Sequence, residues 1–304
     1  MDSIPTLFVD SVAGLFHKSQ TPKELGRVEN PWKNAAVNVQ GNTRIFWIYL
    51  FHNERDEWFY LVEDSSQHRL PFGTRFLPLN DLSWTKQKFV RFQHVSIDSV
   101  GRSDAAIGIS KTDLVERVIP FIARNFPWES SFLTILDVPD REVRRAVFHN
   151  FTSSGQLHIA FNDQESVEFL RKFIVARERS HIVFLGIWPE YTIIEAIASP
   201  KVTTIRFEAF QGFTSNLTLG MCKAALKRFE DLEGKDSISV IGRHGFDVGE
   251  LKTLVPDASV WEWVDEWVVF DQSYPGFGKL LQFEYNFTKG ETTITDWRTV
   301  VRRF

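Results

Sequence analysis

Residues 156–188 decide the fold of this chain, and they read QLHIAFNDQESVEFLRKFIVARERSHIVFLGIW. The run at 156–161 is strand-like, because it is short, largely apolar and bounded by polar turn-forming residues. Residues 165–177 place apolar side chains at helical spacing, and residues 181–188 form a second strand-like run. This order predicts a strand–helix–strand unit, the building block of an α/β domain.

The same alternation continues on both sides of this unit. The other predicted strands are 94–98, 132–138, 202–207 and 237–242, and the other predicted helices are 113–125, 141–151, 191–198 and 219–232. The strand centres Ile135, Ile159, Phe184 and Ile205 are 24, 25 and 21 residues apart, a period typical of leucine-rich-repeat-like solenoids. The chain lacks a consensus asparagine ladder, so a doubly wound open sheet remains the alternative to the solenoid.

β-rich segments flank the alternating region. Residues 44–51 and 57–62 are rich in strand formers and predict a hairpin, followed by an irregular connector at 64–90. Residues 280–287 and 292–301 predict a C-terminal hairpin that caps the open end of the repeat. We therefore divide the chain into a helical segment at 1–41, a hairpin and connector at 42–90, and an α/β repeat domain at 91–304.

Composition excludes several classes of protein. The formal net charge is −4, without the basic excess that binding to nucleic acid phosphates requires. The basic groups Arg141, Arg144 and Arg145, and Arg298, Arg302 and Arg303, are interpreted as solvated faces. Cys222 is the only cysteine, which excludes an internal disulfide and a cysteine-rich metal site. No apolar run is long enough to span a membrane, so we expect a cytoplasmic or nuclear protein.

No motif in the sequence indicates catalysis. Phosphate-binding glycine loops and the serine nucleophile elbow are absent, and the eight histidines lack ligand spacing. We expect Cys222 to be a buried, inert thiol and Asp140 to cap a helix. The predicted protein has no catalytic residue, metal or cofactor, although an enzyme with a dispersed carboxylate or histidine site remains a rival hypothesis.

The first 40 residues carry the most specific pattern. Apolar residues recur at helical spacing in three short segments, and so short a segment cannot bury them all internally. The positions concerned are Ile4, Pro5, Phe8, Val9, Val12, Leu15, Leu25, Val28 and Trp32. The surplus apolar face therefore needs a partner.

This pattern resembles an F-box, and the whole chain resembles nematode F-box proteins that carry an F-box-associated domain. The resemblance implies a substrate-recognition subunit of an SCF-type cullin–RING ubiquitin ligase. The listed residues would contact the Skp adaptor or form the F-box core, and residues 91–260 would supply the surface for an unidentified protein target. Two alternatives remain open: a protein-interaction scaffold with a degenerate F-box, and a helical cap packed on the sheet.

Overall fold

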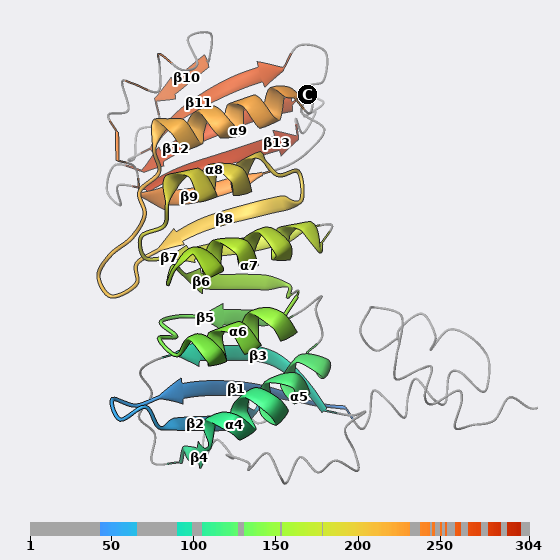
Figure 1. The fold of residues 1–304 in the computed structure, drawn as a ribbon. Coiled ribbons are helices and arrows are strands. Elements are labelled where there is room, and N and C mark those ends of the chain that lie inside the picture. Colours follow the sequence, from blue (N-terminus) through green and yellow to red (C-terminus); the bar gives the residue numbers. More distant parts are fainter. Residues whose placement is uncertain are drawn as a thin grey trace, which may run out of the picture. The chain divides into compact units, whose positions relative to one another are not determined.

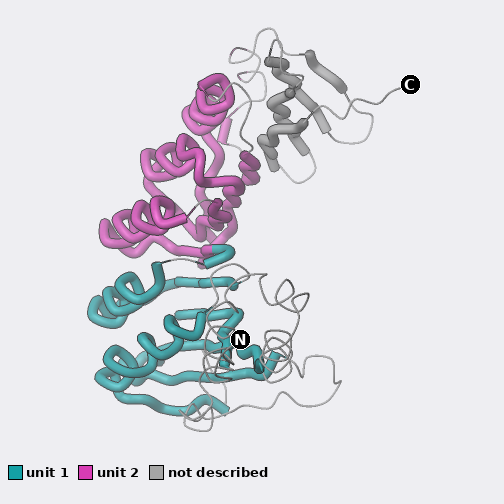
Figure 2. The backbone as a smooth tube through the Cα atoms, turned by 90° about the vertical axis from the view of Figure 1, so that its right-hand side faces the viewer, with its two compact units in different colours: residues 1–156 teal, residues 157–304 magenta. Residues whose placement is uncertain are grey.

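The chain forms two compact units, residues 1–156 and residues 157–304 (Figure 2). The computed structural model describes residues 43–65, 90–98, 105–126, 131–152, 154–177, 179–231, 238–243, 245–246, 250 and 253, and the backbone of four strands between 259 and 298. The nine residues predicted to contact the adaptor, Ile4 to Trp32, lie outside the described residues. The boundary between the units, after residue 156, falls inside the α/β repeat domain predicted for residues 91–304.

The first unit contains a mixed sheet with the strand order β5-β3-β1-β2-β4. Its strands are β1 (Arg44–His52), β2 (Trp58–Asp64), β3 (Val90–Asp98), β4 (Ile107–Ile109) and β5 (Phe132–Ile135). The predicted hairpin is confirmed, because β1 and β2 pair antiparallel from Phe46↔Asp64 to His52↔Trp58. The side chain of Asn53 stabilises the turn by accepting hydrogen bonds from the N–H groups of Arg55 and Glu57.

Helices cover one face of this sheet (Figure 1). They are α4 (Lys111–Asp113), the π-helical turn η4 (Leu114–Val118), α5 (Ile119–Arg124) and α6 (Arg141–Asn150). Phe46, Ile48 and Phe92 point toward this face and are fully buried. The ring of Phe92 meets Phe121 of α5 edge-on, with 5.8 Å between ring centroids.

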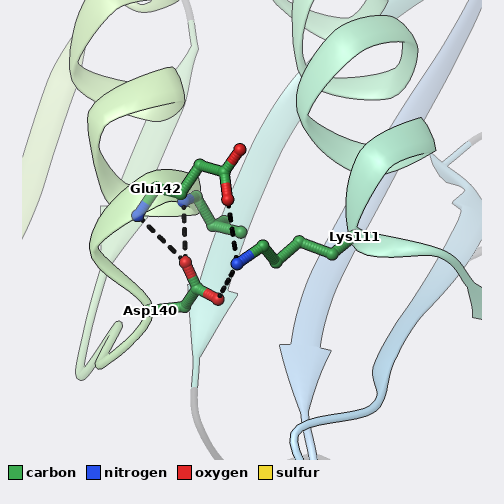
Figure 3. Close-up of polar contacts among 4 residues, drawn as sticks. Lys111, Asp140 and Glu142 are labelled. Carbon is green, nitrogen blue, oxygen red and sulfur yellow. Dashed lines mark hydrogen bonds and ion pairs between the residues drawn. The ribbon is translucent and has the colours of Figure 1, made fainter.

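An ion-paired lysine joins the first and last of these helices (Figure 3). As predicted, Asp140 caps α6, accepting hydrogen bonds from the N–H groups of Glu142 and Val143. Lys111 Nζ lies 3.0 Å from Asp140 Oδ2 and 2.9 Å from Glu142 Oε2. Its hydrogen bonds to Glu142 and Asp140 raise the pKa of Lys111 above its usual value. Because Lys111 and Glu142 are exposed, we interpret these ion pairs as a surface contact, called here the Lys111 clamp, that stabilises the fold only modestly.

The basic group beside this clamp is not simply a solvated face. Arg144 is buried, and its Nη1 donates a 2.8 Å hydrogen bond to the carbonyl of Val138. Its neighbours Arg141 and Arg145 are less buried. The prediction was therefore wrong for Arg144, because its guanidinium donates to a carbonyl of the loop between β5 and α6 instead of to water.

The second unit adds its strands in chain order. Strands β6 (Gln156–Ala160), β7 (Ser180–Leu185), β8 (Val202–Glu208) and β9 (Ser239–Arg243) are successive neighbours, and β7, β8 and β9 pair in parallel. Helices α7 (Gln164–Val175), α8 (Glu190–Ala198) and α9 (Leu219–Asp231) alternate with them and lie on one face (Figure 1). Both units thus confirm an α/β fold, with element ranges within a few residues of those predicted.

An antiparallel extension completes the second unit. Its strands are β10 (Ser259–Glu262), β11 (Trp267–Tyr274), β12 (Lys279–Asn286) and β13 (Glu291–Arg298). β13 pairs antiparallel with β9, so it occupies the edge that the last parallel strand would otherwise expose.

The core of the second unit lies between the helices and the sheet. Phe184 and Phe207 stack there with ring centroids 5.9 Å apart, and Cys222 of α9 is fully buried. Burial raises the pKa of the Cys222 thiol to about 12. The predicted burial of this thiol is therefore confirmed, and its raised pKa disfavours the nucleophilic thiolate. Among the helices described, none combines the length and apolar character that a bilayer crossing needs.

Candidate partner-binding surface

Exposed apolar side chains gather at one edge of the second unit, where the parallel strands end. Phe161 follows β6, Ile187 follows β7, Tyr191 lies in the first turn of α8, and Phe213 lies in the loop after β8. Their exposed fractions are 38%, 62%, 49% and 63% respectively. We call these four residues the carboxyl-edge cluster. Loops at the carboxyl ends of parallel strands commonly form binding sites in α/β proteins.

A buried tryptophan, Trp188, packs against Phe161 of the cluster. Trp188 is 4% exposed, and its ring centroid lies 5.4 Å from that of Phe161 and 5.0 Å from that of Phe184. Its Nε1–H donates a 3.1 Å hydrogen bond to the carbonyl of Ile159. Trp188 therefore links the ends of β6 and β7 to the exposed ring of Phe161.

A second set of hydrogen bonds fixes the loop after β8 against the loop after β7. The carbonyl of Gly186 accepts hydrogen bonds from the N–H and the hydroxyl of Ser215, at 2.8 and 3.1 Å. The Ser215 hydroxyl in turn accepts a 2.8 Å hydrogen bond from the N–H of Trp188. Gly186 has φ +73°, a conformation that favours glycine, and its N–H donates to the carbonyl of Glu208. These bonds hold Ile187 and Phe213 on adjacent, ordered loops.

Phe213 itself is presented by a tight hairpin turn. Phe210 and Phe213 exchange both backbone hydrogen bonds, with N···O distances of 2.7 and 3.0 Å. The two residues between them, Gln211 and Gly212, have φ angles of 52° and 82°. Positive φ at both central positions is the mark of a type I′ turn. An exposed aromatic ring on so constrained a backbone loses little entropy on binding, a feature of interaction hot spots.

A small polar cavity opens at the ends of β8 and β9, next to Thr214, the residue that follows Phe213. Its volume is about 190 Å³, and it is lined by Arg206, Phe207, Glu208, Ala209, Thr214, Ile241, Gly242 and Arg243. Arg206 Nε lies 3.4 Å from Glu208 Oε1. Burial lowers the pKa of nearby His158, with Glu208 acting to raise it and Arg206 to lower it further. The lowered pKa disfavours the charged form of His158, and Arg206 and Arg243 are the cationic side chains that line this cavity.

The first unit has a different exposed feature, a row of aromatic rings on the sheet face opposite its helices. His94 lies 5.7 Å from both Trp47 and Tyr49 and 6.4 Å from Phe132, measured between ring centroids. Phe132 is 41% exposed. Burial, followed by the charge and hydrogen bond of Glu63, raises the pKa of Tyr49 to about 12.

This pKa gives a direct test of the aromatic row. We expect one tyrosine phase near pH 12 in an ultraviolet titration of the phenolic groups, and Tyr49→Phe should remove it. Glu63→Gln should move the phase down only in part, because burial is the larger cause. Since the folded pKa exceeds the usual value of 10.0, the stabilisation from neutral Tyr49 is complete below pH 10 and is lost between about pH 10 and 12. Identical titration curves for the wild type and Tyr49→Phe would contradict this placement.

The sequence analysis did not predict the carboxyl-edge cluster, although one local sequence pattern indicates part of it. The two-residue stretch Gln211-Gly212 between two phenylalanines is compatible with a type I′ hairpin. No such signal marks Ile187 or Tyr191. Over the part of the chain with described side chains, no group of three or more histidine, cysteine, aspartate or glutamate residues is arranged to hold a metal ion.

Comparison with known proteins adds no assignment: no protein-family model, curated protein or solved structure matches this chain.

Proposed function

We propose that this protein is a substrate-recognition subunit of an SCF-type cullin–RING ubiquitin ligase. Residues 1–41 bind a Skp-type adaptor through the F-box-like positions, and the carboxyl-edge cluster binds the protein target. The carrying observation is the cluster itself, in which Ile187 and Phe213 are each more than half exposed on hydrogen-bonded loops. Large apolar side chains held rigidly in solvent are typical of protein-binding surfaces.

The mechanism is proximity rather than covalent chemistry by this chain. One end holds the adaptor, and the other end holds the target near a ubiquitin-carrying enzyme on the same cullin. The effective concentration of target lysines then rises without any new catalytic group. In this proposal the protein is not an enzyme, needs no cofactor, and works in the cytoplasm or nucleus.

A leucine-rich-repeat-like organisation suits this role. Two observations support this organisation. Strands β6 to β9 are neighbours in chain order, and helices α7, α8 and α9 lie on one face of the sheet. Each repeat then packs on its neighbours and contributes one loop to the same edge. The cluster consists of such contributions from the loops after β6, β7 and β8.

The second candidate function is a protein-interaction scaffold without ligase coupling. It uses the same carboxyl-edge cluster and differs only at the N-terminus, where Gly14 and the sequence Glu29-Asn30-Pro31 depart from the F-box pattern. Under this hypothesis the target binds and the adaptor does not.

The target-binding half is tested by placing charges in the cluster. The double variant Ile187→Asp and Phe213→Asp should lose at least about tenfold in target affinity, because each change buries a carboxylate in an apolar interface. Quantitative proximity labelling in cells, with wild type and variant at equal levels, measures the loss for every neighbouring protein. Adaptor labelling should stay constant.

Val175→Asp is the matched control, since Val175 is 70% exposed at the end of α7, and its carbonyl accepts a hydrogen bond from Lys201, the residue before β8. This position is at the opposite edge of the sheet. If the control and the double variant changed the labelling pattern equally, the cluster would not be the target surface.

A further inference from the structure

The cavity next to Thr214 is a gap between two strand ends. β8 and β9 pair from Thr204↔Ser239 to Arg206↔Ile241, and no pairing continues beyond that point. The ring of Phe207 lies against Gly242, where an added Cβ would collide with Phe207 Cδ2. The aromatic ring thus takes the space of a side chain at position 242, and the strand ends diverge around it. The gap has a volume of about 190 Å³, room enough for one side chain of a partner.

The charges around the gap favour an anion. Arg206 and Arg243 both line it and are exposed, whereas Glu208 is its one lining carboxylate. Arg206 forms an ion pair with Glu208, with 3.4 Å between Nε and Oε1. Arg243 forms no ion pair with any residue whose side chain is described. Two guanidinium groups therefore line the gap with one carboxylate. A guanidinium binds a carboxylate through two parallel hydrogen bonds, the strongest common pairing of this kind.

The neighbouring surface is apolar. Thr214 lines the gap and directly follows Phe213, the most exposed ring of the carboxyl-edge cluster. Ile241 and Phe207 also line the gap, so the methylene groups of an inserted side chain would find apolar contacts. A ligand complementary to both parts carries a carboxylate next to an apolar side chain.

We propose that this gap recognises an acidic side chain of the protein target, with Arg243 and Arg206 binding its carboxylate while an adjacent apolar residue packs on Phe213. This inference rests on the proposed target-binding role of the carboxyl-edge cluster. It specifies the target segment as an acidic residue beside a large apolar one. The competing structural role for Arg243 is a cross-strand pair with Glu291, whose backbone lies opposite it in β13.

The test selects a phage-displayed library of random linear peptides on the full-length protein. The expected result is enrichment of peptides with aspartate or glutamate beside a large apolar residue. The most enriched peptide and its acid-to-amide analogue are then synthesised, and their dissociation constants are measured for wild type, Arg243→Gln, Arg243→Lys and Arg179→Gln. Arg179 is an exposed arginine just before β7, at the other end of that strand, and serves as the control.

On the wild type and on Arg179→Gln, changing the acid to the amide should weaken binding about tenfold. On Arg243→Gln the same change should have less than about a twofold effect, and Arg243→Lys should restore part of the difference. Two results together would overturn the proposal in favour of the cross-strand pair. The preference for the acid over the amide peptide would be unaffected by Arg243→Gln, and Arg243→Gln and Glu291→Gln would lower the stability equally.

The outcomes separate this inference from the proposed function. Enriched peptides that are apolar without an acidic preference, and that lose binding with Phe213→Asp, would overturn the acidic pocket and leave the target surface standing. Enrichment no greater on the wild type than on Phe213→Asp would overturn both.

Discussion

Replacing Trp188 with alanine is expected to lower the free energy of unfolding by about 3–5 kcal/mol, the usual range for removal of a buried tryptophan. Trp188 contacts the rings of Phe161 and Phe184 and donates its indole hydrogen bond to Ile159. Removal leaves a cavity where the indole packed and deletes its buried hydrogen bond to the carbonyl of Ile159. Urea denaturation followed by circular dichroism measures the change, and the loss of ordered Phe161 should also weaken target binding.

Trp188→Phe separates the two contributions. Phenylalanine keeps an aromatic ring between Phe161 and Phe184 but cannot donate to the carbonyl of Ile159. We expect a loss of about 1–2 kcal/mol, well below that of the alanine variant. A Trp188→Ala variant within about 1 kcal/mol of the wild type would show that Trp188 is not the central support of this edge.

The second large effect is expected at Arg228, a buried arginine on α9. It is 4% exposed, and its Nη1 donates hydrogen bonds of 2.9 and 2.8 Å to the carbonyls of Ile197 and Val202. These carbonyls belong to α8 and to the first residue of β8, so Arg228 holds three elements together. Arg228→Met keeps the helix propensity and the aliphatic length but removes both of these buried hydrogen bonds. We expect a loss of about 3 kcal/mol in the same denaturation experiment.

Lys227→Met provides the matched control, because Lys227 is the exposed neighbour on the same helix. Its stability should stay within about 0.5 kcal/mol of the wild type. Equal effects of the two substitutions would mean that the charge of α9, rather than the buried hydrogen bonds of Arg228, determines the stability.

The alternation of strands and helices could be predicted because each element carries its own periodic pattern. The helix predicted over 113–125 shows where this approach stops. Pro120 cannot donate a backbone hydrogen bond, and the preceding turn widens to the π-helix Leu114–Val118, in which the N–H of Ile119 bonds to the carbonyl of Leu114. The apolar periodicity continues through this turn, so the pattern alone does not reveal it.

The carboxyl-edge cluster could not be predicted, because the identity of a residue as phenylalanine does not tell whether its side chain is exposed or buried. Phe213 is exposed next to a two-residue turn with positive φ angles, whereas Phe184 is fully buried and stacks on Phe207. The hydrogen bonds that join the loops of the cluster link residues 22 to 29 positions apart, as between Gly186 and Glu208 or Gly186 and Ser215. Such contacts depend on which strands become neighbours, and a local sequence pattern does not encode this.

Co-expression of the full-length chain with a Skp adaptor, followed by size-exclusion chromatography, tests the central proposal most directly. The ligase-receptor account predicts a stoichiometric complex that is lost when residues 1–40 are deleted, while the deleted protein still binds the target with unchanged affinity. A full-length chain that is folded and monodisperse but elutes without the adaptor would contradict the account, and the interaction scaffold would then be the better description.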